Sequence, residues 1–286
     1  MRDRTATHSP EKIGMELKSL RLIYFSPTKT TKTVLEAIAR GIPVDTTHHM
    51  DLTLPNSGPQ TDQTIADDLV TIGVPVYGGR VPPIAAKRIR RIRGNGAPAV
   101  VVVVYGNRAY DDALLELRDL ALEIGFMPVA GGAFVGEHSF ASDTIFIANG
   151  RPDEGDCNQA EMFGATILHK LAERSDIDQL PKLQVPGNFP YQDHMPPGNV
   201  SPVTQDDSCT ECETCVSVCP TAAIALNDRV TTSTQLCILC CACVKNCPSG
   251  SRVMAEPGVL QIAEWLRENC RDPRQPELFF SSIAGG

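Results

Sequence analysis

The strongest constraint in this sequence is a pair of cysteine runs near its carboxyl end. The first run is Cys209-x2-Cys212-x2-Cys215-x3-Cys219, and the second is Cys237-x2-Cys240-x2-Cys243-x3-Cys247. A proline follows the last cysteine of each run, so the chain cannot continue there as a helix. This spacing is the one by which thiolates hold a [4Fe–4S] cluster. Both runs are therefore predicted to ligate iron–sulfur clusters.

The segment from Ser208 to Ala255 resembles a bacterial two-cluster ferredoxin. In such proteins the fourth cysteine of each run ligates the other cluster. The resemblance implies one cluster on Cys209, Cys212, Cys215 and Cys247, and a second on Cys237, Cys240, Cys243 and Cys219. Zinc and disulfides are the alternatives, but zinc sites use pairs of cysteines rather than two runs of four.

The chain has 286 residues, which favours about two domains. Its net charge of −8 argues against nucleic acid as the main partner. It contains no run of about 18 apolar residues, so we expect no membrane span. The first residues lack the apolar core of a signal peptide. Reduced thiols together with oxygen-sensitive clusters indicate the cytoplasm, and an anaerobic source.

Apolar strand patterns alternate with helical patterns through the first half of the chain. The expected strands are Leu20–Phe25, Val44–Met50, Leu69–Val76, Ala99–Tyr105 and Met127–Val135. The expected helices are Val34–Arg40, Pro82–Arg93, Ala113–Ile124 and Asp156–Arg174. This alternation predicts an α/β fold, a flavodoxin-like, five-stranded, parallel, doubly wound sheet with strand order 2-1-3-4-5.

The predicted domain organisation has five parts. Residues 1–18 form an N-terminal extension, 19–175 the flavodoxin-like domain and 176–205 a linker rich in Pro, Gly and Asp that lies over the surface. Residues 206–256 form a small α+β two-cluster ferredoxin domain. In 257–286 we expect an amphipathic helix, Pro257–Asn269, that packs against the first domain or a second copy, followed by a poorly ordered tail from Arg271.

The loop after the first strand is predicted to bind a phosphate. It places hydroxyls and backbone N–H groups at the start of a helix, where anions bind. It resembles the flavodoxin loop that holds the phosphate of FMN, but a lysine stands where that loop has glycine, in a position that can demand an unusual backbone angle. A hydroxyl-rich N-cap is the alternative. The candidate residues are Ser26, Thr28, Lys29, Thr30 and Thr31.

Two further loops lie at the same expected edge of the sheet, where open α/β sheets bind ligands. Their tyrosines can stack on a flat ring, their glycines allow close approach of the backbone, and Arg80 and Arg108 can offset charge on a reduced flavin. Each residue also has an ordinary structural explanation. The candidates are Pro75, Val76, Tyr77, Gly78 and Gly79 in one loop, and Tyr105, Gly106, Asn107, Arg108, Tyr110 and Asp111 in the other.

With these loops and the cysteine runs, residues 18–256 resemble flavodoxin–ferredoxin fusion proteins, the EFR1-type ferredoxins. The motifs that carry the resemblance are Phe25-Ser-Pro-Thr28, Pro75-Val-Tyr-Gly-Gly-Arg80 and Tyr105-Gly-Asn-Arg-x-Tyr-Asp-Asp112. The resemblance implies FMN in the first domain, two [4Fe–4S] clusters in the second, and low-potential electron transfer.

The expected function is an electron-transfer flavoprotein that relays electrons between the two clusters, FMN and external redox proteins, namely a ferredoxin-type donor and an acceptor enzyme. An FMN-dependent reductase of a small substrate is the alternative, with Tyr110 or His138 as proton donor, and a redox sensor is a third possibility. The basic run Lys87–Arg93 is either a solvated helix face or a dock for a redox partner or for this chain's own ferredoxin segment. The sequence does not decide whether the protein forms a homodimer.

Overall fold

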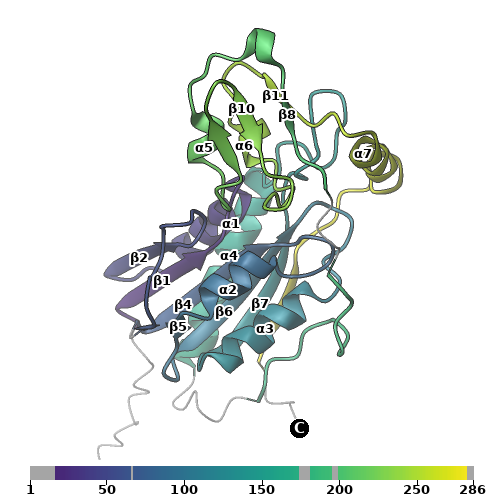
Figure 1. Cartoon of the computed structure of the whole chain (residues 1–286). Coiled ribbons are helices and arrows are strands. Elements are labelled where there is room, and N and C mark those ends of the chain that lie inside the picture. The colour runs from purple at the N-terminus through teal and green to yellow at the C-terminus, as the bar shows by residue number, and fades with distance from the viewer. Residues whose placement is uncertain (1–16, 66, 174–180, 195–198, 282–286) are drawn as a thin grey trace, which may run out of the picture.

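The computed structural model describes residues 17–65, 67–173, 181–194 and 199–281. Most of these residues form one twisted sheet covered by helices, and a smaller lobe lies above one edge of it (Figure 1). The sheet contains β1 (Ser19–Tyr24), β2 (Thr46–Asp51), β4 (Leu69–Pro75), β6 (Pro98–Tyr105), β7 (Met127–Val135) and β12 (Glu277–Phe280). Most of the expected extension, and part of the expected linker, lie outside the described residues.

The strands lie in the order β2-β1-β4-β6-β7-β12. The first five are parallel to one another, and β12 runs antiparallel to β7. The protein is therefore α/β with a mainly parallel central sheet. The expected count of five strands is wrong, because a segment from the carboxyl end of the chain adds a sixth.

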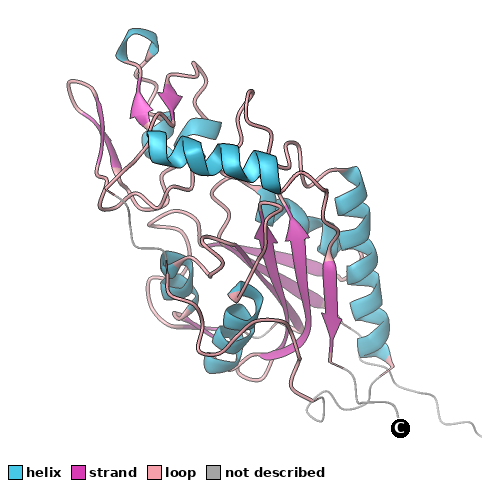
Figure 2. Ribbon diagram, turned by 90° about the vertical axis from the view of Figure 1, so that its right-hand side faces the viewer, coloured by secondary structure: helices cyan, strands magenta, loops and turns pink. Residues whose placement is uncertain are grey.

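Helices cover both faces of the sheet (Figure 2). On one face, α1 (Thr30–Arg40) and α4 (Glu154–Ala172) share an apolar core with alternate residues of β1 and β6. On the other, α2 (Pro83–Ile89) and α3 (Ala113–Glu123) pack over the opposite alternate residues. Strand β6 is buried from Ala99 to Tyr105, so its valine run faces a core on both sides.

Helix α2 is shorter than expected. It ends at Ile89, and Ile92 and Arg93 instead form β5, which pairs in parallel with β3 (Gln63–Thr64). Ile92 is fully buried in the core beneath α2 and α3. The prediction of a helix as far as Arg93 is thus wrong, because Ile92 reaches the core from a strand rather than from another turn of the helix.

The smaller lobe consists of two short antiparallel strand pairs and short helices. Strand β8 (Val203–Thr204) pairs with β11 (Arg252–Val253), and β9 (Ile224–Leu226) with β10 (Val230–Thr232). The turns between them contain η1 (Asp206–Ser208), α5 (Thr214–Ser217) and α6 (Ala242–Lys245). The lobe lies over the carboxyl ends of the parallel strands (Figures 1 and 2).

The last helix, α7 (Pro257–Asn269), lies beside the lobe and packs on the loop after β7. Ala263 and Leu266 pack with Ala141, Ile145 and Ile147, so the expected amphipathic helix packs against the first domain. The chain then returns to the sheet as β12, where the ring of Phe280 lies 5.4 Å from that of Phe163. The prediction of a poorly ordered tail is therefore wrong for residues 277–281, and the last five residues lie outside the described part.

No helix in the described ranges is long and apolar enough to cross a membrane.

Candidate functional site

The second cysteine run lines a hollow on the side of the lobe that faces the sheet. Cys237, Cys240 and Cys243 come from the turn before α6 and from α6 itself, and Cys219 comes from the first run. Ile238 and Cys241 line the same hollow. Three cysteines of one run and the last cysteine of the other are thus grouped as the crossover arrangement predicts.

The remaining cysteines line a second hollow. Cys209, Cys212 and Cys215 come from the first run, and Cys247 comes from the second. Arg252 also lines this hollow, and Cys212 is exposed to solvent. The two hollows therefore divide all eight cysteines of the two runs into two sets of four.

The same backbone conformation brings the cysteines together in both runs. Glu211 and Glu213 have positive φ angles of 54° and 55°, and Leu239 and Cys241 have φ angles of 54° and 55°. A left-handed conformation costs a side-chain-bearing residue about 1–2 kcal/mol. Such strain persists only where the surrounding structure, here a ring of sulfur atoms around a hollow, determines the conformation. Cys241 is accordingly a buried turn residue before α6.

Hydrogen bonds reach several of the sulfur atoms. The Ala223 N–H donates to Cys219 Sγ at 3.2 Å, and the hydroxyls of Ser249 and Ser251 lie 3.6 and 3.4 Å from Cys247 Sγ. Burial alone would raise the pKa of Cys247, but these hydroxyls and the Arg252 N–H lower it to about 7. Burial raises the pKa of Cys240. Donors around sulfur stabilise thiolates and tune bound clusters.

The sulfur atoms of the two sets do not converge into a site for a single metal ion in the described part of the chain. Among the described residues, no three His, Cys, Asp or Glu side chains converge closely enough to hold one ion. A tetrahedral zinc site has Zn–S bonds of about 2.3 Å and therefore needs sulfur atoms only about 3.8 Å apart.

The predicted phosphate loop lies between β1 and α1, at the edge of the sheet that the lobe covers. Lys29 is the N-cap of α1 and has a positive φ of 69°, as expected for a position usually occupied by glycine. Ser26 Oγ accepts the Lys32 N–H at 3.0 Å. Thr31 is fully buried, and its hydroxyl has no hydrogen-bond partner in the described structure. A buried hydroxyl without a partner is costly and fits a site that a polar ligand completes.

The loop after β4 lies between the sheet and the inner hollow. Gly78 and Gly79 have positive φ angles, and Tyr77 and Arg80 form an isolated bridge that closes the turn. Tyr77 is half-buried, and its pKa is raised well above its ordinary range, mainly by burial and then by the nearby thiols of Cys240 and Cys241. The Tyr77 side chain therefore lies close enough to the second cysteine run to feel its charge.

Residues 270–277 of the same chain contact the third predicted loop. Asn107 Nδ2 donates to the carbonyls of Cys270 and Asp272 at 2.7 and 3.1 Å, and its Oδ1 accepts the Arg274 N–H at 3.0 Å. Tyr110 donates to Glu277 Oε2 at 2.8 Å.

Tyr105 is buried against the Tyr110 ring, and Arg108 pairs with Asp111. Both tyrosines are therefore buried within the chain, and Tyr110 contacts the segment that leads to β12.

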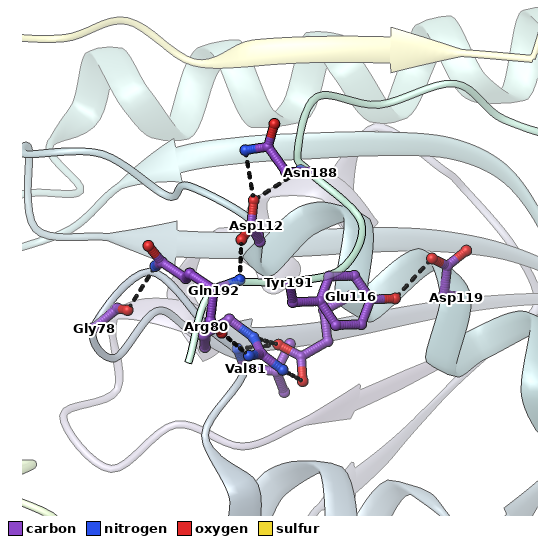
Figure 3. A network of polar contacts seen from close by, with 9 residues as sticks. All are labelled: Gly78, Arg80, Val81, Asp112, Glu116, Asp119, Asn188, Tyr191 and Gln192. Carbon is purple, nitrogen blue, oxygen red and sulfur yellow. Dashed lines mark hydrogen bonds and ion pairs between the residues drawn. The ribbon is translucent and has the colours of Figure 1, made fainter. Parts of the chain in front are cut away.

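The Arg80 side chain also makes its contacts with other residues of the chain (Figure 3). Its guanidinium pairs with Glu116 at 2.8 Å and lies 4.9 Å from the centroid of the Tyr191 ring. Gln192, which lies with Tyr191 in the expected linker, donates to the Gly78 carbonyl at 2.9 Å. Asp112 accepts the backbone N–H groups of Asn188 and Gln192 at 2.8 and 2.7 Å. The described part of the linker is thus fixed along α3 and the loop after β4.

His138 packs on Gly106, where an added Cβ would come within 2.2 Å of its ring. Its Nδ1 accepts the Phe140 N–H at 3.0 Å. The pKa of His138 is lowered to about 4, mainly by burial and to a smaller extent by the positive charges of Lys245 and Arg108. The imidazole is therefore neutral near pH 7.

Three contacts that the sequence did not reveal join the lobe to the sheet domain. Ile238 lines the inner hollow and also packs against the core beneath α2 and α3. Arg88 donates to Pro220 O at 2.7 Å and to the carbonyls of Leu52 and Thr53. Lys245 pairs with Glu137 and donates to Ala141 O at 2.7 Å. Of these residues, only Arg88 was indicated by the sequence, because it lies in the basic run that was considered as a dock for the ferredoxin segment.

Residues 202–225 match a family model described as a 4Fe-4S binding domain. The match contains the whole first cysteine run and supports an iron–sulfur cluster in the lobe. No curated protein matches the chain.

Among solved structures, a flavodoxin from the domain Archaea is 13% identical, with a TM-score of 0.36 over 54% of this chain and 98% of that chain. A flavodoxin of Streptococcus pneumonia TIGR4 is 15% identical, with a TM-score of 0.37 over 53% and 99%. A WrbA-like flavodoxin from Agrobacterium tumefaciens is 16% identical, with a TM-score of 0.39 over 55% and 98%. These scores are low, so the description of the fold rests on strand order and core packing.

Proposed function

We propose that this protein is an electron-transfer protein of the flavodoxin–ferredoxin fusion type, with two [4Fe–4S] clusters in its lobe and FMN at the covered edge of its sheet. The inner cluster would be held by Cys219, Cys237, Cys240 and Cys243, and the outer by Cys209, Cys212, Cys215 and Cys247. The proposed domain limits are 19–175 for the sheet domain and 206–256 for the lobe, and the proposed location is the cytoplasm.

The observation that carries this proposal is the position of Ile238. This side chain belongs to the turn between two proposed ligands and packs into the core of the sheet domain. Tyr77 meets the same turn from the loop after β4. One packed contact thus connects the inner cysteine set to the loop edge, as a protein that passes electrons between the two sites requires.

The residues at this edge fit FMN in part. Ser26, Thr28, Lys29, Thr30 and Thr31 would hold the phosphate, and the backbone of Pro75–Gly79 together with Tyr77 would face the ring. Gly106 would contribute only backbone, and we assign no side-chain contact to Tyr105, Asn107, Arg108, Tyr110 or Asp111, whose partners are within the chain. When bound, FMN supplies the exchange of one or two electrons.

The chain's own residues set the conditions for that exchange. Ile238 packs against the core of the sheet domain, and the half-buried Tyr77 would lie between the proposed sites. The exposed Cys212 places the outer set near the surface, where an external redox protein can approach. This fits a relay between external redox partners, a ferredoxin-type donor and an acceptor enzyme.

The alternative, a reductase that acts on a small substrate at FMN, has less support. Tyr110 is hydrogen-bonded to Glu277 and buried, which removes it as a proton donor to a substrate. His138 is neutral and packed against Gly106. Gln192 and the lobe also cover the loop after β4, where a substrate would need to enter.

Anaerobic reconstitution followed by iron, sulfide and flavin analysis tests the proposal. We expect about eight irons and eight sulfides per chain, together with one FMN. Cys219→Ser should lower the iron content, whereas Cys157→Ser, on α4 and outside both cysteine runs, should leave it unchanged. About four irons per chain, bound zinc in place of iron, or an absence of flavin would each contradict the proposal.

A further inference from the structure

The two cysteine runs are halves of an internal repeat. Each cysteine of the first run recurs 28 positions later, from Cys209 to Cys237 and from Cys219 to Cys247. The fifth residue after the last cysteine differs in character between the halves, because it is Ile224 in the first and Arg252 in the second. Both residues begin short strands, β9 and β11. A charged residue thus replaces an apolar one at equivalent points of the lobe.

Both side chains are buried. Ile224 is 6% exposed and packs in the apolar cluster of the lobe with Cys215, Cys219 and Cys243. Arg252 is 3% exposed, although it carries a full positive charge. Arginine is rarely buried to this extent unless an anion compensates its charge.

The partners of Arg252 within the chain are neutral oxygens and one sulfur atom. Its guanidinium donates to Thr204 Oγ1 at 2.8 Å, Pro202 O at 2.9 Å and Thr232 Oγ1 at 3.0 Å. No salt bridge within the described residues involves it, and its Nε is buried without a hydrogen-bond partner there. Burying a charge this way is costly without an anionic partner.

The position of Arg252 identifies the missing anion. Its Nη2 lies 3.7 Å from Cys243 Sγ, which belongs to the inner hollow. The same residue lines the outer hollow of Cys209, Cys212, Cys215 and Cys247. Arg252 therefore contacts the inner cysteine set through its guanidinium and also lines the hollow of the outer set.

We infer that Arg252 is a buried counter-ion shared by the two [4Fe–4S] clusters and that it raises their reduction potentials; this inference rests on the proposed function. Reduction adds one electron, and so one negative charge, to a cluster already surrounded by four thiolates. A fixed cation and N–H donors next to the sulfurs stabilise the reduced form more than the oxidised form. No bond is made or broken, and the electron comes from an external reductant such as dithionite.

The test is an anaerobic redox titration of the full, reconstituted chain, with the reduced clusters monitored by electron paramagnetic resonance. Arg252→Met removes the charge and keeps an apolar side chain like that of Ile224. At a fixed potential near the native midpoint, we expect its ratio of reduced to oxidised clusters to fall about tenfold, a shift of about 59 mV for a one-electron couple. Arg252→Lys retains a charge and should stay within about threefold of the native ratio.

Ile224→Met is the matched control, because it changes packing at the equivalent position without a change in charge. The inference is overturned if Arg252→Met binds its full iron and keeps the native midpoint, or if Ile224→Met or Arg252→Lys shifts the midpoint as far as Arg252→Met does. Failure of the proposed function is a separate result, because the native chain would then bind neither cluster.

Discussion

Lys29 starts helix α1 in a left-handed conformation, with φ of 69°. Glycine adopts this conformation without steric cost, so Lys29→Gly should raise the free energy of unfolding by about 0.5–1 kcal/mol. The same change removes a cation from the proposed phosphate loop, and we expect the affinity for FMN to fall several-fold.

Urea unfolding and flavin fluorescence titration measure these two effects. Lys32→Gln, a charge removed one turn further along the helix, is the control and should change flavin binding less. The account of this loop is wrong if Lys29→Gly destabilises the chain or binds FMN as tightly as the native protein does.

His138 gives the stability a dependence on pH. Its pKa is lowered from 6.5 to about 4, mainly by burial. Between these values the unfolded chain binds a proton that the folded chain does not, so the free energy of unfolding rises with pH through this window. Acidification from about pH 6.5 to pH 5.5 should remove about 1 kcal/mol, because the unfolded histidine is only half protonated at the start of this range.

Anaerobic urea unfolding at several pH values measures this slope. His138→Phe should flatten it, and substitution of the exposed His169 by Gln should not. An unchanged slope in His138→Phe would show that another group is responsible.

Among the elements, β12 depends on contacts far away in the sequence. Asn107 makes three hydrogen bonds to the segment that leads from α7 to β12. Asn107→Ala leaves two carbonyls and one N–H without these partners, and we expect a loss of about 2–3 kcal/mol. Backbone amides of β12 should exchange with deuterium faster in this variant, whereas those of β1 should not. Equal protection of β12 in both proteins would contradict its dependence on Asn107.

Burial and strand pairing explain which strands could be predicted from the sequence. Strand β6 was evident from its valines, because a strand covered on both faces is apolar throughout. Strand β12 was missed because Glu277–Phe280 is short and half-exposed, and forms only by pairing with β7.

Within the site, the cysteine spacing and the ferredoxin resemblance led to two sets of four cysteines, and the same sets line the two hollows. Asn107 and Tyr110 were assigned to a ligand because no local pattern shows that residues 270–277 return to cover their loop.

At the scale of the molecule, Arg88 fastens the lobe to the sheet domain. It donates to Pro220 O in the lobe and to Leu52 O and Thr53 O in the sheet domain. Arg88→Gln should weaken this docking by about 1–3 kcal/mol, because hydrogen bonds from a charged group are lost. Faster deuterium exchange in the turn that carries Ile238 would report it.

Arg90→Gln is the control, since among the described residues the Arg90 side chain pairs with the exposed Glu123 and makes no bond to the lobe. If both variants exchange alike, or if neither differs from the native protein, Arg88 does not hold the lobe in place.

The most direct measurement of the central claim is the rate of electron transfer within one chain. The reconstituted protein is reduced anaerobically by a pulse of radiolytic electrons, and cluster and flavin absorbance are followed together. Because the lobe is packed on the sheet domain, the exchange should be first-order, with a rate constant that stays the same over about a tenfold range of protein concentration. A rate proportional to concentration, or reduced clusters that never exchange electrons with the flavin, would contradict the account.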